Sequence, residues 1–476
     1  MSMRTELFID GQFVSGEEAP ERILNPATGE EITKVHEASI GQIEHAVRCA
    51  ERAFEGWRKT TPRDRAMMLL RVADRIEHNG AELARLESLN AGKPYAAMLN
   101  DEIPVIADVF RFFAGAARTM TGSATNEYLA GHTSMIRRDP IGVIASIAPW
   151  NYPLMMAAWK LCPALAAGNT IVLKPSEQTP LSTLKLAEYM AEVFPPGVVN
   201  IICGRGETVG APLIGQSEVR MISLTGDVST GQKVLESAAR GIKRTHLELG
   251  GKAPALVFAD ADMDAVVQGI RAFGYYNAGQ DCTAACRVYA QKSIYDNLVA
   301  DLGLAVSSIR IGEQNDQGVE MGPCISERQR DRVAGFVERA RLQSHIEVVC
   351  GGRPAQRRGF FFEPTVVAHA RQSDEIVRRE VFGPVVSVTP FTDPEEAVKL
   401  ANDTDYGLAS SVWSGDVGKA MQVASALQYG TTWINTHFML TAEMPHGGLK
   451  RSGYGKDQSM YALEEYTCAR HIMVKL

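Results

Sequence analysis

The 476-residue chain has no apolar run long enough to span a membrane, and its first residues, MSMRTELFIDGQF, contain no apolar core of signal-peptide length. We therefore expect a cytoplasmic protein that does not bind membranes. Basic clusters are also absent. The 49 Lys and Arg residues are scattered and the formal net charge is −7, which argues against nucleic acid as a partner. The eight cysteines are dispersed without a disulfide framework, as is typical of a reducing compartment.

Strand-length apolar runs alternate with helix-length segments along the chain, as in an α/β protein. Short apolar runs predict strands at 141–148, 170–173, 198–203, 221–224 and 245–247. Helix-length segments at 154–166 and 181–193 separate them, and this order favours a doubly wound, mostly parallel sheet. Before residue 120, apolar periodicity predicts amphipathic helices at 40–55 and 63–89.

The length of the chain exceeds what one hydrophobic core usually supports, so two or more domains are expected. A second set of strand and helix patterns runs from residue 255 to about residue 435, with strands predicted at 287–290 and 384–390. We place the boundary between the two sets near Gly250 and Gly251.

Cys282 follows a stretch of small and turn-forming residues, Asn277-Ala278-Gly279-Gln280-Asp281, where the backbone can approach a ligand closely. A single cysteine in a reducing compartment is more often a small buried apolar residue than a nucleophile. Cys286 lies four residues later, but no second Cys or His pair accompanies it and the two-residue gap of redox motifs is missing. We therefore expect neither a metal nor a redox pair here.

Further motifs, in order and over nearly the whole chain, make the sequence resemble the aldehyde dehydrogenase superfamily. Glu248 lies 34 residues before Cys282, an interval similar to that of the family. The matching motifs are Asn25-Pro26-Ala27-Thr28-Gly29, Pro149-Trp150-Asn151-Tyr152-Pro153, Lys174-Pro175-Ser176-Glu177, Leu224-Thr225-Gly226 followed by Gly231, Leu247-Glu248-Leu249-Gly250-Gly251-Lys252 and Glu380-Val381-Phe382-Gly383-Pro384.

The resemblance implies an aldehyde dehydrogenase-like α/β fold. Its parts would be a parallel-sheet NAD-binding domain (1–119 and 141–250), an α/β catalytic domain (251–452) and a small β oligomerisation element (120–140 and 453–476). Edge strands of such an element usually find a partner, and the resemblance to the family implies a homotetramer.

The resemblance also implies three catalytic residues. Cys282 would attack the aldehyde as a thiolate, Asn151 would form an oxyanion hole with the backbone N–H of Cys282, and Glu248 would activate the water that hydrolyses the thioester. Each residue also has an ordinary structural interpretation. Glu248 would pair with Lys252 or Arg244, and Asn151 would be a turn residue.

The cofactor implied by the resemblance is NAD, although no Gly-x-Gly-x-x-Gly follows the first strand and Gly204-Arg205-Gly206 is only a near miss. A carboxylate at Glu177 would accept from the 2′-hydroxyl of the ribose and repel a 2′-phosphate, which favours NAD over NADP. The expected cofactor-binding residues are Trp150, Lys174, Glu177, Gly226, Asp227, Gly231, Leu249, Glu380 and Phe382.

Asp227 departs from the family pattern, in which serine is common after the glycine. Two interpretations stay open. Its charge would weaken binding of the pyrophosphate, or its side chain would turn away to cap the following helix.

The substrate is predicted to be an aminoaldehyde. The segments 101–118, 273–289 and 435–448 resemble bacterial γ-aminobutyraldehyde dehydrogenases, which implies oxidation of 4-aminobutanal to 4-aminobutanoate. Acceptors or π-faces for an ammonium group would be Tyr152, Trp159, Asp281 and Asp108, with the two aromatic residues equally consistent with core positions. His446 stands where some betaine aldehyde dehydrogenases have Trp, which disfavours a quaternary ammonium.

Three alternatives remain open at this stage. Betaine aldehyde or a broad range of aldehydes would be oxidised by the same machinery. Coenzyme A would replace water as acyl acceptor, which Glu248 argues against. A non-catalytic binding protein with this fold is the remotest alternative, because Cys282, Glu248 and Asn151 are all intact.

Overall fold

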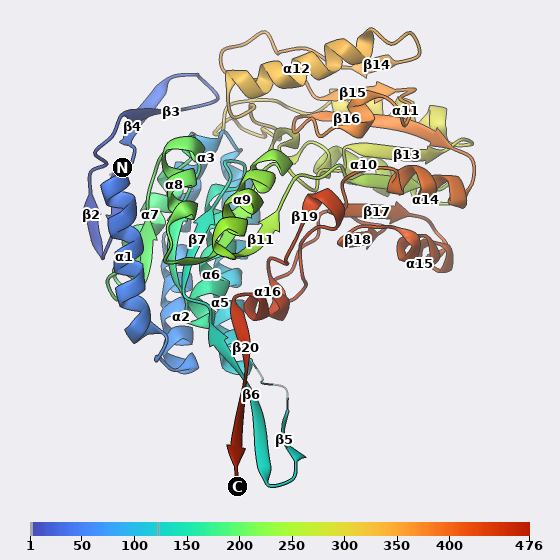
Figure 1. The fold of residues 1–476 in the computed structure, drawn as a ribbon. Helices are drawn as coiled ribbons and strands as arrows, with labels where there is room; N and C mark the ends of the chain where they lie inside the picture. The colour runs from blue at the N-terminus through green and yellow to red at the C-terminus, as the bar shows by residue number, and fades with distance from the viewer. Residues whose placement is uncertain (1–2, 121, 123) are drawn as a thin grey trace.

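Two mixed sheets form the body of the computed structural model, which describes residues 3–120, 122 and 124–476 (Figure 1). The first sheet has the order β19-β11-β10-β7-β8-β9-β1-β2. Its parallel centre comprises β7 (Val143–Ile147), β8 (Thr170–Lys174), β9 (Val199–Ile201), β10 (Val219–Thr225) and β11 (Arg244–Glu248). The antiparallel strands at its edges are β1 (Leu7–Ile9), β2 (Gln12–Val14) and β19 (Gly453–Tyr454). The predicted α/β class is confirmed.

Helices pack on this sheet as the apolar patterns predict, and α6 (Pro153–Ala167) is buried at every residue because α5 (Ile103–Thr119) and α2 (Pro62–His78) cover it. The other helices of this region are α1 (Ile40–Trp57), α4 (Tyr95–Ala97), η1 (Met98–Glu102), α7 (Leu181–Ala191), η2 (Gly206–Gly210), α8 (Ala211–Gly215) and α9 (Val228–Gly241). The prediction of one helix over 63–89 is wrong. Asn79 leaves the helical conformation at φ −106° and ψ 17°, and α3 (Gly80–Ala91) starts a new helix.

The second sheet begins with β12 (Pro254–Val257), six positions after the end of β11, and has the order β14-β15-β16-β13-β12-β17-β18. Its other strands are β13 (Arg287–Gln291), β14 (Glu347–Cys350), β15 (Thr365–Ala368), β16 (Val385–Phe391), β17 (Ala409–Trp413) and β18 (Thr431–Ile434). Alternate residues of β12 enter different cores: Ala255 and Val257 on one face, Leu256 on the other.

Both faces of the second sheet are covered by helices, as a mainly parallel sheet requires. They are α10 (Met263–Phe273), α11 (Tyr295–Ser307), α12 (Glu327–Arg341), α13 (Glu375–Arg378), α14 (Pro394–Asn402) and α15 (Val417–Ala426). The 3₁₀ turns η3 (Tyr276–Gly279) and η4 (Lys450–Ser452) and the hairpin of β3 (Pro20–Leu24) with β4 (Glu31–His36) complete the body.

A three-stranded antiparallel arm projects from the body in the order β20-β6-β5 (Figure 1). It consists of β5 (Thr125–Leu129), β6 (His132–Pro140) and β20 (Thr467–Lys475). Residues 121 and 123 of the predicted element lie outside the described residues. The segment from residue 453 contacts both the body and the arm. β19 pairs with β11 and α16 (Ser459–Glu465) packs on α6, while only β20 joins the arm.

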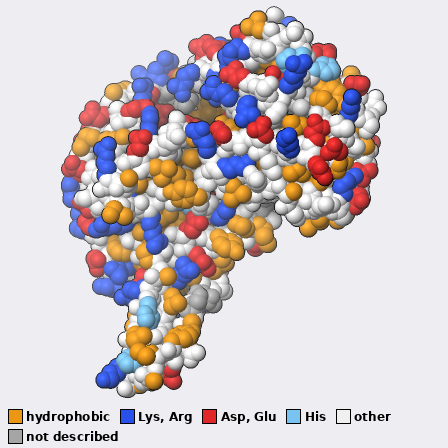
Figure 2. Space-filling model, turned by 45° about the vertical axis from the view of Figure 1, so that its right-hand side comes forward, with side chains coloured by type: hydrophobic (Ala, Val, Ile, Leu, Met, Phe, Trp, Pro, Cys, Tyr) orange, Lys and Arg blue, Asp and Glu red, His pale blue; other side chains and the backbone are white. Residues whose placement is uncertain are grey.

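Hydrophobic side chains gather on the arm and beside its base (Figure 2). Exposed apolar residues of the arm include Tyr128, Leu129, Met473 and Val474. No helix in the described part of the chain is long and apolar enough to cross a membrane.

Candidate active site

The loop before Cys282 has an uncommon backbone. Asn277, Ala278 and Gly279 have φ of 49°, 56° and 65°, and this left-handed conformation is strained for Ala278, whereas asparagine and glycine tolerate it. A Cβ on Gly279 would lie 2.2 Å from the carbonyl oxygen of Gly383. Gln280 anchors the loop, because its Oε1 accepts from the backbone N–H of Ile325 at 2.8 Å. Packing of the second domain therefore holds the strained loop in place.

Cys282 is half-buried and its backbone rests on the glycine pair that follows β11. A Cβ on Gly251 would lie 2.1 Å from the carbonyl oxygen of Cys282, so only glycine allows this approach. β11 ends at Glu248, and the short step through Gly250 and Gly251 therefore brings the carboxyl group to the thiol.

Three chemical groups converge at this point. Cys282 Sγ, a carboxylate oxygen of Glu248 and a ring nitrogen of His446 all lie within 4.8 Å of one another. Burial, followed by the charges of Asp281, Glu248 and Glu380, raises the pKa of the Cys282 thiol. Burial raises the pKa of Glu248 to about 8 and lowers the pKa of His446 to about 4. The imidazole is therefore neutral at pH 7, and Glu248 can hold and release a proton near that pH.

Asn151 lies just beyond the carboxyl end of β7 and is buried beside the cysteine loop. Its Nδ2 donates to the carbonyl oxygen of Gln280 at 3.1 Å, and its own carbonyl accepts from Asn277 Nδ2 at 2.8 Å. The structure thus brings together Asn151, Cys282 and Glu248, the three predicted catalytic residues.

Behind Glu248 lies a buried ionic network that sequence reasoning missed. Asp457 binds Lys160 Nζ at 3.1 Å and His246 Nε2 at 3.1 Å, and His246 Nδ1 contacts Glu465 at 2.8 Å. Lys160 and His246 lower the pKa of Asp457 although burial opposes this. Neither predicted partner of Glu248 takes the role proposed for it: Arg244 donates to the Thr467 carbonyl at 2.7 Å, and Glu248 Oε1 has no hydrogen-bond partner among the described residues.

Asp227 caps α9, as one of the two open interpretations requires. Its Oδ1 accepts from the backbone N–H of Thr230 at 2.9 Å and from the Ser229 hydroxyl at 2.6 Å. These hydrogen bonds lower its pKa in spite of burial. Gly231, one turn later, allows close packing, because a Cβ there would lie 2.6 Å from the side chain of Leu249.

The remaining predicted cofactor residues fit a dinucleotide at the carboxyl ends of β8, β10 and β11. Lys174 Nζ donates to the carbonyls of Pro175 and Gly204 at 2.8 Å each and lies 3.8 Å from Glu177. The hydroxyl of Thr225, directly before Gly226, is buried and has no hydrogen-bond partner in the described part of the chain, so a donor remains for a ligand at this edge.

The far end of this region lies against the second domain. Glu380 Oε1 accepts from the backbone N–H of Gly251 at 2.8 Å, and burial raises the pKa of Glu380 to about 7. Trp150 and Phe382 pack edge to face with ring centroids 5.2 Å apart. Glu380 thus lies at the same glycine pair on which the backbone of Cys282 rests.

On the other side of Cys282, Asp281 is fully engaged. Its Oδ2 accepts from the Tyr152 hydroxyl at 2.6 Å, and its Oδ1 accepts from the backbone N–H and hydroxyl of Thr283 at 2.6 and 2.7 Å. The ammonium group of Lys93 lies 4.0 Å from the Tyr152 ring centroid and pairs with Glu102 at 2.6 Å. Both oxygens of the Asp281 carboxylate are therefore occupied by hydrogen bonds from within the chain.

Trp159 and His446 form a second aromatic pair, with ring centroids 5.4 Å apart. Asp108 does not join the site. It lies on the exposed face of α5 and, among the described residues, forms no hydrogen bond or ion pair. The nearer carboxylate is Asp101, which accepts from the Tyr276 hydroxyl at 3.4 Å. Asp101 was not among the residues predicted from the sequence, and Asp108 was predicted in its place.

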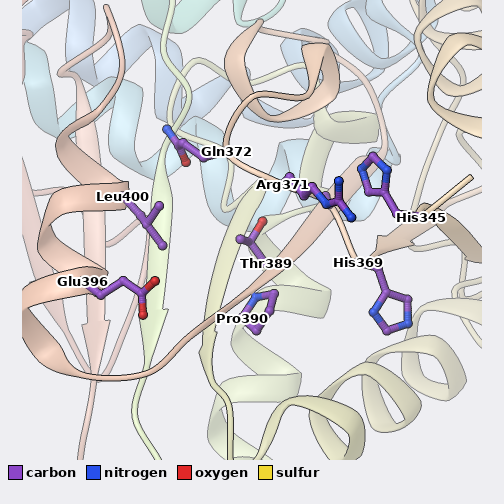
Figure 3. Close-up of a pocket in the computed structure, with 9 residues that line it drawn as sticks. His345, His369, Arg371, Gln372, Thr389, Pro390, Glu396 and Leu400 are labelled. Carbon is purple, nitrogen blue, oxygen red and sulfur yellow. The ribbon is translucent and has the colours of Figure 1, made fainter. Parts of the chain in front are cut away.

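A separate cavity of about 470 Å³ opens on the second domain between α14 and the end of β15 (Figure 3). It is lined by His345, His369, Ala370, Arg371, Gln372, Thr389, Pro390, Glu396 and Leu400. His345 pairs with Asp374 at 2.9 Å, and the lining contains none of the residues around Cys282. This hollow is therefore not the reaction site.

Comparisons with known proteins agree with this geometry. Residues 13–472 match the model of the aldehyde dehydrogenase family. A betaine aldehyde dehydrogenase of Bacillus subtilis is 41% identical over 99% of this chain and 97% of its own length. A phenylacetaldehyde dehydrogenase of Pseudomonas fluorescens is 39% identical over 98% and 95%. The solved structure of betaine aldehyde dehydrogenase from Staphylococcus aureus in complex with NAD+ is 39% identical, covers 99% of this chain and 95% of that one, and superposes with a TM-score of 0.97.

Proposed function

Because this chain belongs to the aldehyde dehydrogenase family and uses NAD as its cofactor, we propose that it oxidises a small aldehyde whose tail carries a positive charge. The observation that carries the proposal is the pair of Tyr152 and Asp281 directly beside the nucleophile. Such a pair sets a buried negative charge behind an aromatic ring, so a cationic tail that approaches the ring is attracted by the charge without touching the carboxylate.

The surrounding charges support a cationic substrate. Asp281, Glu102 and Glu87 are buried carboxyl groups. Within the described residues, Glu102 and Glu87 both form their ion pairs with Lys93. Burial raises the pKa of Glu102 to about 7, so it stays partly ionised at neutral pH. This side of the thiol therefore has an excess of negative charge, which attracts cations and disfavours acidic aldehydes.

Betaine aldehyde is the first candidate substrate. The rings of Trp159 and His446 contact each other. His446 therefore provides an aromatic surface at the position where some betaine aldehyde dehydrogenases have tryptophan, although we expected this surface to be missing. Relatives over nearly the whole chain include betaine aldehyde dehydrogenases. The 4-aminobutanal predicted from the sequence is the second candidate, because a primary ammonium uses the same carboxylates and rings.

The roles of the catalytic residues follow from their positions. Cys282 attacks the aldehyde carbon as a thiolate, and the N–H groups of Asn151 Nδ2 and of the Cys282 backbone stabilise the developing alkoxide, at about 3 kcal/mol for one such donor. NAD, when bound, supplies the hydride acceptor. Glu248 then takes a proton from water as that water attacks the thioester carbon, which releases the carboxylic acid and restores the thiol.

A substrate panel with matched neutral analogues tests the proposal. Betaine aldehyde is compared with 3,3-dimethylbutanal, and 4-aminobutanal with pentanal, because each pair differs mainly in charge. We expect NADH formation without coenzyme A and a higher kcat/KM for the charged member of each pair. Equal kcat/KM values within both pairs, or a preference for phenylacetaldehyde, would overturn the cationic specificity, and a need for coenzyme A would overturn hydrolysis by Glu248.

A further inference from the structure

The group formed by Cys282, Glu248 and His446 has the composition of a metal site. Its possible ligand atoms are one sulfur, one nitrogen and one oxygen, all within 4.8 Å of one another. Zinc binds these atom types at about 2.0–2.3 Å with tetrahedral geometry, which separates ligand atoms by roughly 3.5 Å. The ligand atoms therefore need to approach by at most about 1.3 Å, which torsions of the Cys282 and Glu248 side chains provide.

Two of these side chains have unused capacity for a ligand. Glu248 and His446 are each only 2% exposed, and Glu248 Oε1 and His446 Nδ1 have no hydrogen-bond partner among the described residues. The His446 backbone is fixed by a two-way bridge, because it donates to the carbonyl of Asp457 at 2.8 Å and accepts from the Asp457 N–H at 2.7 Å. Trp159 packs on the ring and limits its rotation. A fixed, unpartnered imidazole beside a thiol and a carboxyl group is prepared for a cation.

A second group, Asp10, His45 and Cys49, has the same atom types but lacks this capacity. Arg52 occupies it, since its guanidinium donates to Cys49 Sγ at 3.0 Å and lies 3.6 Å from Asp10. A divalent cation would have to displace this positive charge. The second group therefore serves as an internal comparison for the first.

We propose that Cys282, Glu248 and His446 form an inhibitory site for a thiophilic divalent cation of the zinc class. At pH 7, binding of the ion releases two protons to solvent, one from the Cys282 thiol and one from the Glu248 carboxyl group, and forms thiolate–metal and carboxylate–metal bonds whose two negative charges balance the ion. A water molecule completes the tetrahedral shell. Since the ion holds the nucleophile and the proposed base, it excludes the aldehyde, and removal of the ion by a chelator restores turnover. The inhibition, but not the binding, rests on the proposed function.

The charges around the site fit a cation. Asp281 and Glu380 add negative potential at the thiol, while Lys160, His246 and Lys456 face Glu248 with opposite sign. Lys160 is held by Asp457, and Lys456 Nζ donates to the carbonyls of Gly447 and Gly448 at 2.6 and 3.2 Å. Asp457 thus pairs with Lys160 and His246 and backbone carbonyls hold Lys456, while Glu248 Oε1 has no hydrogen-bond partner among the described residues.

Equilibrium dialysis of the chelator-treated, full-length enzyme against Zn²⁺, without NAD or aldehyde, tests the binding. We expect one ion per chain at this site, weakened about tenfold or more in His446→Phe, which keeps a ring beside Trp159. His45→Phe is the matched control and should bind as the wild type does. Co²⁺ should give a thiolate charge-transfer absorption that is absent in Cys282→Ser, and Mg²⁺ should not compete because it prefers oxygen ligands.

Equal zinc affinity of the wild type and His446→Phe, or a loss of binding in His45→Phe, would refute the site. If His446→Phe does not fold, alkylation of Cys282 in the wild type decides. Saturating Zn²⁺ should slow the alkylation by at least about tenfold, and an unchanged rate contradicts the proposal. None of these measurements uses turnover, so they remain decisive if the proposed substrate is wrong.

Discussion

Replacing Asp281 with asparagine separates the two effects of its charge. The substitution keeps the size of the side chain and an acceptor for Thr283, whose N–H lies 2.6 Å from Oδ1. It removes the negative charge beside Cys282 and behind Tyr152. The Tyr152 hydroxyl, which donates to Oδ2 at 2.6 Å, can accept from the new amide instead. The local structure should therefore survive while the electrostatics change.

The magnitude follows from Coulomb's law. A cation in contact with the Tyr152 ring would lie roughly 7 Å from the Asp281 carboxylate, and at an effective dielectric constant of about 20 the attraction is about 2 kcal/mol. The KM for betaine aldehyde should thus rise roughly 30-fold relative to the KM for 3,3-dimethylbutanal. Because the same charge raises the pKa of Cys282, alkylation of the thiol by iodoacetamide should begin at a lower pH in the variant.

Steady-state kinetics with both aldehydes and the pH dependence of alkylation measure the two effects. Asp101→Asn is the control, because this carboxylate contacts Tyr276 and is not among the groups that shift the pKa of the thiol. Equal changes in the two KM values would refute the argument that Asp281 holds the charged tail. An unchanged alkylation profile would refute its effect on the thiol.

Three further variants test the site. Glu248→Gln should lower kcat by about 10²–10⁴ while stopped flow still shows a first burst of NADH, and it should abolish the rise of kcat through the pKa of about 8 at which the wild-type carboxyl group ionises. Asp227→Ser should leave the KM for NAD unchanged, whereas Asp227→Ala should lower the free energy of unfolding in urea by about 1 kcal/mol through loss of the cap. Gly251→Ala should lower kcat/KM at least about 10²-fold with unaltered circular dichroism, because its Cβ would displace the Cys282 carbonyl. A missing burst in Glu248→Gln would contradict the role of Glu248, and a changed KM for NAD in Asp227→Ser would contradict the capping role. A kcat/KM equal to that of the wild type in Gly251→Ala would contradict the need for glycine.

Elements with a strong local pattern were predictable from the sequence. The strand at 170–173 and the helix at 154–166 were predicted within a residue or two, because their apolar runs end at clear turn residues. The break at Asn79 was missed, since apolar periodicity continues through it. The family, the α/β fold and NAD are confirmed, whereas the cytoplasmic location and the homotetramer stay predictions.

The catalytic residues were predictable because each stands in a contiguous motif, but their surroundings were not. Lys160 and Asp457 lie almost 300 positions apart, so neither residue carries a local signal of the other. His446 was considered only as a replacement for tryptophan, and its approach to Cys282 depends on the bridge to Asp457. Contacts between distant segments thus account for the gap between the predicted and the observed site.

The left-handed backbone at Asn277, Ala278 and Gly279 limits how this enzyme can be engineered. A saturation library across these positions would contain many destabilised members, because left-handed backbone costs most side chains roughly 1–2 kcal/mol and any Cβ at residue 279 would meet the Gly383 carbonyl. Ala278→Gly is the exception that should gain stability. Variation aimed at new substrates is better placed at Trp159 and His446, whose backbones lie in ordinary conformations.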